Sequence, residues 1–204
     1  MIRLSTALFV LFLFPSVASA QTDPDAAARF ISELGEQAVE VLQDQSTSLE
    51  AREERLRGIV AESLDIKTIG EFAVGKTWER ASEEEKEEYM ELFSVYLLQI
   101  YTQRLGGYTG QTLQIDGSSA YKDRDAVVET TIVQDGADNI DVKWLVRDSD
   151  NDSSKGLRIL DVIVDGKSLA LAQRKEFTNI IAREKMSGLL NLLRLKVSKY
   201  SAQS

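Results

Sequence analysis

The chain has 204 residues, with 24 Lys and Arg against 33 Asp and Glu, a formal net charge of −9, and neither cysteine nor histidine. The missing residue types exclude a disulfide framework, Ser-His-Asp and Cys-His catalytic sites and histidine-rich metal sites. The acidic balance argues against nucleic acid as a partner, because nucleic-acid binding depends on clustered Lys and Arg.

The first twenty residues have the pattern of an export signal. Arg3 precedes an apolar core over residues 7–14, which is followed by Pro15 and by the Ala18-Ser19-Ala20 sequence typical of a cleavage site. The apolar core is far shorter than the roughly 20 residues needed to cross a bilayer. We therefore predict cleavage after Ala20 and one exported domain over residues 21–204, with an uncleaved membrane anchor as the alternative.

Helical periodicity dominates the first half of the mature chain. Apolar residues recur at intervals of three and four over residues 24–44, which predicts a helix with one buried stripe. Thr47 and Glu50 form a capping-box pattern that opens a second helix, expected to reach residue 64. A third, shorter helix is expected over residues 65–74.

The longest predicted helix follows Ser82, which forms a second capping-box pattern with Glu85. This helix is expected to continue until Gly106-Gly107 ends it. Over residues 92–101 only two side chains are polar, so the apolar surface of the helix is wider than a single stripe.

Beyond these glycines the hydrophobic period changes from 3.6 to 2, which predicts strands. Four of them are expected in an antiparallel meander, over residues 112–115, 126–133, 140–147 and 157–164. The last strand is apolar on both faces, with Leu157, Ile159 and Ile163 on one face and Leu160, Val162 and Val164 on the other. A terminal helix, or a pair hinged near Gly188, is predicted over residues 167–195.

An acidic stretch, Asp148-x-Asp150-x-Asp152, has the spacing that begins a calcium-binding loop. Ser153 and Ile159 stand where that loop requires Gly and a bidentate Glu, so a solvated hairpin is the favoured interpretation. The glycines do not form a phosphate-binding motif either. We expect no catalytic site, no metal and no cofactor.

More apolar surface lies on the long helix and the last strand than a simple two-layer core requires. Either several helices sandwich the sheet and bury this surface, or the protein encloses a cavity for an apolar ligand. Periodicity alone does not separate the two interpretations.

Two blocks of sequence resemble the signature of the MlaC family, also called Ttg2D or toluene-tolerance proteins. The first block joins a strand to a helix, and its matching residues are Asp161, Val162, Asp165, Gly166, Ser168, Leu169, Arg174 and Phe177, with residues 188–190 matching the tail of the pattern. The second block spans residues 72–110, and its matching residues are Gly75, Trp78, Phe93, Leu97, Tyr101 and Tyr108. One departure is the absence of the aromatic residue that the family often has a few places before the Asp-Val pair.

The resemblance implies an α+β fold in which a twisted four-stranded antiparallel sheet is wrapped by several helices around an apolar lipid cleft. It implies a monomeric periplasmic shuttle, not an enzyme, that binds phospholipid within an ABC-type lipid transport system and maintains outer-membrane lipid asymmetry. The implied partners are an inner-membrane lipid ABC transporter complex and an outer-membrane lipoprotein–porin complex. A hopanoid-associated lipid-binding protein of the same family and a non-lipid interaction module are the alternatives.

The resemblance also implies roles for individual residues. The Asp165-Gly166 turn is expected to fold the final helix back over the sheet, with Ser168 as its cap. Arg174 is expected either to hold this helix to the sheet through a carboxylate such as Asp161 or to contact the lipid head group. The residues implied for the lipid cleft, several of which also suit the core, are Phe72, Trp78, Phe93, Leu97, Tyr101, Trp144, Val162, Phe177 and Ile181.

Overall fold

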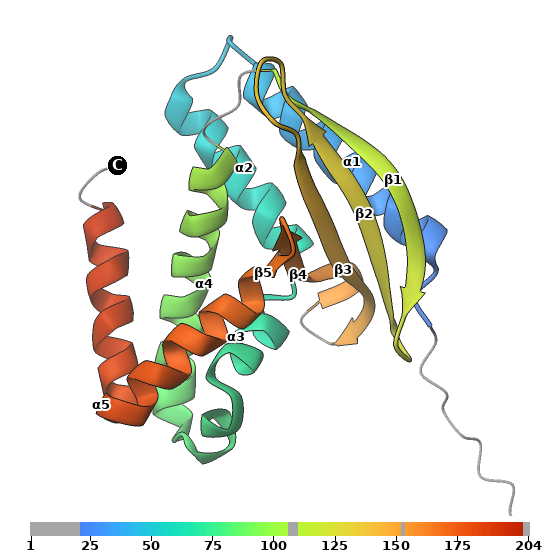
Figure 1. Ribbon diagram of the computed structural model, residues 1–204. Helices are drawn as coiled ribbons and strands as arrows, with labels where there is room; N and C mark the ends of the chain where they lie inside the picture. Colours follow the sequence, from blue (N-terminus) through green and yellow to red (C-terminus); the bar gives the residue numbers. More distant parts are fainter. Residues whose placement is uncertain (1–20, 106–109, 152–153, 202–204) are drawn as a thin grey trace, which may run out of the picture.

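The computed structural model describes residues 21–105, 110–151 and 154–201, so the predicted export signal, the Gly106-Gly107 pair and Asp152 lie outside the described residues. The helices are α1 (Pro24–Gln43), α2 (Leu49–Ser63), α3 (Ile66–Val74), the 3₁₀ helix η1 (Gly75–Arg80), α4 (Glu83–Leu105) and α5 (Leu169–Ser201). The strands are β1 (Thr112–Tyr121), β2 (Asp125–Val133), β3 (Ile140–Asn151), β4 (Ser154–Val164) and β5 (Lys167–Ser168). A run of strands between two groups of helices is the expected α+β arrangement (Figure 1).

Short polar side chains set where the helices begin. At α4 the predicted capping box is confirmed, because the N–H of Glu85 donates to the Ser82 hydroxyl at 3.2 Å and the N–H of Ser82 donates to the Glu85 carboxylate at 3.1 Å. At α2 the predicted cap is wrong by one residue. Ser48, and not Thr47, caps this helix by accepting a hydrogen bond from the N–H of Ala51 at 3.2 Å.

The sheet is an antiparallel meander in the order β1-β2-β3-β4-β5, so a two-residue fifth strand joins the four that were predicted. The strands are also longer than predicted. Tight hairpins pair Tyr121 with Asp125 and Asn151 with Ser154, and the strand ladders therefore continue almost to the turns. The acidic stretch that begins at Asp148 is consequently strand, rather than loop, as far as its described residues reach.

A β-bulge changes which side chains of β4 face inward. The pairing of β4 with β3 skips Leu160, and one extra residue in a strand reverses the alternation of the residues that follow. The prediction that Ile159 and Val162 lie on opposite faces is therefore wrong. Both residues, together with Val164, line the space between the sheet and α1.

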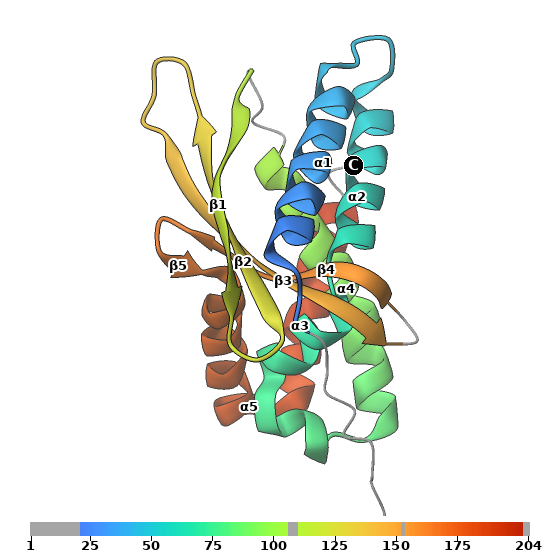
Figure 2. The ribbon, with the colours of Figure 1, turned by 90° about the vertical axis from the view of Figure 1, so that its right-hand side faces the viewer.

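Helix α1 lies along one face of the sheet with α2 beside it, as the two ribbon views agree (Figures 1 and 2). Helices α3, α4 and α5 pack together into a helical part, which is joined to the rest of the fold where α4 packs against α2 and α5 packs against β4. Lys185, at φ 62° and ψ −169°, breaks α5 into two halves, and the second half runs back along α4. The hinge predicted near Gly188 therefore lies slightly earlier. None of the helices in the described part of the chain is long and apolar enough to span a bilayer.

The helical part has an aromatic core. Tyr89, Phe93, Tyr96 and Phe177 are at most 3% exposed, and neighbouring ring centroids lie 5.3–6.3 Å apart in stacked, tilted and edge-on pairs. The Tyr89 hydroxyl donates a hydrogen bond to the carbonyl of Gly70 at 2.9 Å, and burial raises the pKa of this hydroxyl. Phe177 points inward, as predicted.

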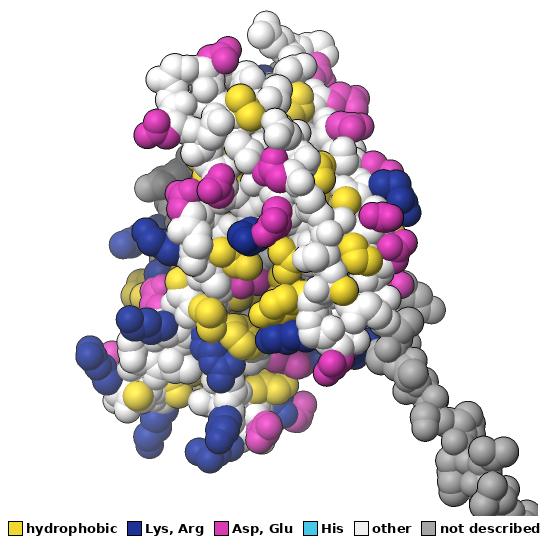
Figure 3. Space-filling model, turned by 45° about the vertical axis from the view of Figure 1, so that its right-hand side comes forward, with side chains coloured by type: hydrophobic (Ala, Val, Ile, Leu, Met, Phe, Trp, Pro, Cys, Tyr) yellow, Lys and Arg dark blue, Asp and Glu magenta, His cyan; other side chains and the backbone are white. Residues whose placement is uncertain are grey.

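Charge is unevenly distributed over the surface. Figure 3 shows Lys and Arg side chains gathered on the lower left of the molecule, where Figure 1 places α5 and α3, whereas Asp and Glu predominate over the upper half. The formal net charge of −9 therefore hides a local excess of positive charge.

Candidate functional site

A cavity of about 430 Å³ lies between α1, α2 and the face of the sheet that α1 covers. This volume falls within the roughly 300–1,000 Å³ typical of small-molecule sites. Most of the lining is aliphatic: Ile31, Leu34, Gly35, Ala38, Val39, Leu42, Ile59, Val60, Ser63, Leu64, Tyr101, Gln111, Thr112, Leu113, Ile132, Gln134, Ile140, Val142, Trp144, Ile159, Val162, Val164 and Leu169. The surplus apolar surface of the sequence thus forms a cavity wall in addition to a packed core.

Helix α1 forms one wall because its apolar residues recur at helical spacing. Ile31, Leu34, Ala38 and Leu42 all face the sheet across the cavity. Gly35 lies on the same stripe, and a β-carbon there would approach the Leu113 side chain to 2.7 Å. The sequence pattern predicts that this stripe is buried but does not assign it to the site, because a ligand-facing stripe and a core-facing stripe have the same period.

Strand β3 forms the opposite wall with alternate residues, among them Val142 and Trp144. The indole N–H of Trp144 donates to the Thr130 hydroxyl at 2.9 Å, and that hydroxyl donates to the carbonyl of Val142 at 3.0 Å. The indole N–H of Trp144 and the hydroxyl of Thr130 therefore both have hydrogen-bond partners within the sheet. As a result, Trp144 presents an apolar surface to the cavity.

Three of the polar lining residues, Gln111, Thr112 and Gln134, lie together at one end of the cavity. Thr112 begins β1 and pairs with Val133 at the end of β2, so Gln111 and Gln134, which lie beside this pair in the chain, are close to each other. The C-terminal end of α1 lies at the same end of the sheet (Figure 1). This end can therefore receive the polar part of a ligand, whereas the remaining walls are mostly apolar and the hydroxyl of Ser63 there donates to the carbonyl of Ile59.

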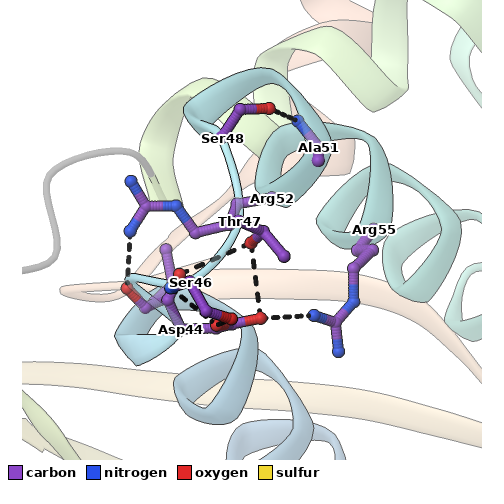
Figure 4. Close-up of polar contacts among 8 residues, drawn as sticks. Asp44, Ser46, Thr47, Ser48, Ala51, Arg52 and Arg55 are labelled. Carbon is purple, nitrogen blue, oxygen red and sulfur yellow. Dashed lines mark hydrogen bonds and ion pairs between the residues drawn. The ribbon is translucent and has the colours of Figure 1, made fainter.

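The loop between α1 and α2 is ordered by the Asp44 carboxylate at this polar end (Figure 4). The carboxylate accepts hydrogen bonds from the hydroxyl and the backbone N–H of Ser46, and it forms an ion pair with Arg55 at 3.1 Å. The hydrogen bond from the Ser46 hydroxyl is the main cause that lowers the pKa of Asp44 below its usual value. Arg52 donates to the carbonyl of the lining residue Leu42 at 3.4 Å, which connects this loop to the cavity.

Three of the nine residues predicted for the lipid cleft line the cavity, namely Tyr101, Trp144 and Val162. The other six lie outside its lining. Phe93, Leu97 and Phe177 are buried in the helical core, Trp78 and Ile181 are partly buried against that core, and Phe72 is 37% exposed. Contact between these six residues and a lipid stays a prediction.

Arg174 lies away from the cavity and holds the end of α3. Its Nη1 donates to the carbonyl of Phe72 at 3.0 Å, and its guanidinium lies 4.6 Å from the centroid of the Phe72 ring. Gly75, at φ 58°, makes room for this contact, because a β-carbon there would be 2.9 Å from Nη2. The last turn of α3 gains a cation at its carbonyl end, which is a stabilising arrangement.

The carboxylate that was considered as a partner for Arg174 has other partners. Asp161 accepts a hydrogen bond from the Ser168 hydroxyl at 2.5 Å and another from the N–H of Ala170 at 3.0 Å. Ser168 in turn accepts from the N–H of Leu171 at 3.0 Å, so its predicted role as the cap of α5 is confirmed. Asp161 thus fixes the strand-to-helix turn of the family signature without an arginine.

Across the described residues, no group of three or more Asp, Glu, Cys or His side chains is placed to hold a metal ion. The described walls of the cavity contain no carboxylate and no ammonium group. The arrangement can exclude water and enclose hydrocarbon, which requires burial rather than bond-making.

Comparison with known proteins agrees with this geometry. Among solved structures, the chain is similar to a phospholipid-binding protein from Ralstonia solanacearum in complex with a phospholipid, with a TM-score of 0.62 and 20% identity over 87% of this chain and 93% of that chain. At this level of identity the likeness shows a shared fold. The sequence model of the MlaC protein family matches residues 32–195, which include all strands and most of both cavity walls. The resemblance seen in the sequence is therefore confirmed, and the chain belongs to the MlaC family.

Proposed function

We propose that this protein is a periplasmic carrier that binds the acyl chains of a phospholipid in the cavity between α1, α2 and the sheet. The observation that carries the proposal is the cavity itself, about 430 Å³ with mostly aliphatic walls, in a member of the MlaC family. The phospholipid in the complex of the structurally similar Ralstonia protein supports the same ligand class.

The energetics of lipid transfer explain why such a carrier needs no catalytic group. Exposing one methylene to water costs about 0.8 kcal/mol, so exposing two acyl chains of roughly 30 methylenes costs more than about 20 kcal/mol. A dry apolar cavity replaces the bilayer interior for the part of the lipid that it encloses, and it lowers the cost of transfer by that amount. Binding and release are then sufficient for function, and we propose a binding protein rather than an enzyme.

The head group is proposed to lie at the polar end of the cavity. Gln111, Thr112 and Gln134 supply amide and hydroxyl groups there, and Arg52 lies next to the lining residue Leu42. Arg174, the head-group contact considered from the sequence, donates to the carbonyl of Phe72 outside the cavity lining and is not part of this proposal.

The family and the export signal predicted before Gln21 support a location in the periplasm. We propose that one domain, from residue 21 onward, shuttles lipid between an outer-membrane lipoprotein–porin complex and an inner-membrane ABC transporter complex. Such a cycle would maintain outer-membrane lipid asymmetry. The energy for net transport would come from the transporter, because the described residues show no nucleotide-binding motif.

The test is organic extraction of the purified protein followed by mass spectrometry. Wild type is expected to release phospholipid in stoichiometric amount. Leu34→Trp, which adds an indole to the cavity, is expected to lose most of that lipid, whereas the control Leu195→Trp, at a position that is 61% exposed, should remain loaded. A hopanoid in the extract would support the family alternative, and an empty wild-type protein that also takes up no lipid from vesicles would overturn the proposal.

A further inference from the structure

Positive charge is concentrated in two segments that pack together. Residues 66–80 and 167–201 contain eleven Lys and Arg against four Asp and Glu, a formal charge of +7, while the remaining residues contain 13 against 29, a formal charge of −16. These segments form α3, η1, β5 and α5, and α3 packs against α5. The segregation is large for a chain whose net charge is only −9.

Three large apolar side chains in these two segments are exposed, and two of them, Phe72 and Leu171, lie close to the same arginine. Leu171 on α5 is 59% exposed and Phe72 on α3 is 37% exposed. Arg174, one helical turn after Leu171, lies over the Phe72 ring and beside Gly75, so the two apolar residues flank one arginine. We name the surface formed by Phe72, Lys76, Leu171, Arg174 and Lys175 the α3–α5 face.

The lysines of the α3–α5 face are available for an external partner. Lys76 and Lys175 are exposed, and neither makes an ion pair with any described residue. Two carboxylates close to them in the chain are engaged elsewhere, since Glu71 pairs with Lys67 and Glu176 pairs with Lys196. Glu79, three residues after Lys76, is exposed and does not pair with it. The face therefore presents uncompensated positive charge around two apolar side chains.

We propose that the α3–α5 face docks the protein onto the surface of an anionic phospholipid bilayer. Cations beside exposed apolar side chains are the pattern of proteins that bind at a membrane interface, where Lys and Arg meet lipid phosphates and the apolar residues enter the acyl boundary. A specific protein–protein interface would instead need about 800 Å² on each partner, with an apolar centre depleted of charge. Two separate apolar residues among cations fit the bilayer better.

The position of this face suits the exchange of lipid. Leu169 lines the cavity and lies two residues before Leu171 in the same helix, so the first turn of α5 connects one wall of the cavity with the docking face. Docking goes beyond the proposed lipid binding and does not depend on it, because attachment to a vesicle can be measured whether or not the cavity is loaded.

The test is flotation of the full mature chain with vesicles of phosphatidylglycerol and phosphatidylcholine, against vesicles of phosphatidylcholine alone. Wild type is expected to float with the anionic vesicles at low salt, and to be released by high salt. Each lysine near an anionic surface contributes about a fivefold gain in partition. Reversal of two of them, in Lys76→Glu with Lys175→Glu, is therefore expected to weaken flotation at least about 25-fold.

A matched control is Arg29→Glu with Lys122→Glu, which changes the charge equally at two exposed positions outside the α3–α5 face. This control should keep at least about a fifth of wild-type partition, and both double variants should melt and carry lipid as wild type does. Equal loss in the two double variants would show a net-charge effect and overturn the docking face. Wild type that ignores anionic vesicles, or binds neutral ones equally well, would overturn it too, and lipid extraction would then still report on the proposed function.

Discussion

The size of the cavity predicts how affinity depends on the length of the bound chain. At roughly 30 Å³ for a group the size of a water molecule or a methylene, a space of about 430 Å³ holds about 14 such groups. Each methylene buried contributes about 0.8 kcal/mol, close to a fourfold change in affinity. For single-chain phospholipids, affinity should therefore rise by about 5 kcal/mol from eight to fourteen carbons and then level off.

The measurement is isothermal titration of delipidated protein with lysophosphatidylcholines of 8 to 18 carbons, each below its micelle-forming concentration. Leu34→Trp should move the plateau to shorter chains, because the indole occupies part of the same volume. An affinity that does not change with chain length would show that the cavity does not hold the chain. An affinity that keeps rising to 18 carbons would show that the chain extends along another surface.

Three further outcomes follow from the same structure. Phe177→Ala should lower the free energy of unfolding by about 3–5 kcal/mol in urea titrations, because a fully buried ring leaves a void in the aromatic core; a loss under about 1 kcal/mol would contradict that position. Ser46→Ala should raise the pKa of Asp44 towards its usual value, as followed by carboxyl NMR titration. Because folding lowers this pKa, the ionised carboxylate stabilises the protein above its unfolded-state pKa, and this stabilisation is lost as the pH falls through the folded-state pKa. Ser46→Ala should therefore lose the stabilisation at a higher pH than wild type does. An unchanged titration of Asp44 would refute the role of Ser46. Removing bound lipid should lower the melting temperature, because only the folded state has the cavity, and an equal melting temperature would mean that the ligand binds elsewhere.

The helix boundaries could be predicted where one side chain decides them. Ser82 and Glu85 have no competitor for the start of α4, and their capping box forms as expected. Before α2, three hydroxyl residues, Ser46, Thr47 and Ser48, follow one another. Asp44 accepts a hydrogen bond from Thr47 at 3.3 Å, which leaves Ser48 to cap the helix. A contact across the loop therefore decided between two equivalent local patterns.

The inward face of β4 could not be predicted, because a β-bulge depends on the partner strand. Strict alternation placed Ile159 and Val162 on opposite faces, but the unpaired Leu160 brings them to the same one. No residue type near Leu160 marks the bulge in the sequence. The same limit applies to Trp144, whose place in the cavity depends on the register of β3 with β2.

The division between core and site follows side-chain shape. Sequence analysis favoured aromatic residues for the lipid cleft, yet Phe93 and Phe177 interlock with each other in the helical core. Flat rings fill a space between helices efficiently and leave little room for a ligand. The walls of the cavity instead carry medium aliphatic side chains such as Leu34 and Val142, which are too short to meet across the gap.

An empty cavity of this size is close to what the fold can tolerate. At about 24 cal/mol for each cubic ångström, about 430 Å³ of void costs on the order of 10 kcal/mol, which is within the usual 5–15 kcal/mol of total stability. Burial of about 14 methylenes returns about 11 kcal/mol. Because the cost of the void and the free energy gained by burying the methylenes nearly cancel, a bound acyl chain completes the core of the protein almost as a side chain would. The empty state is then the strained one, and the protein should release a lipid only where a membrane or another apolar cavity receives it.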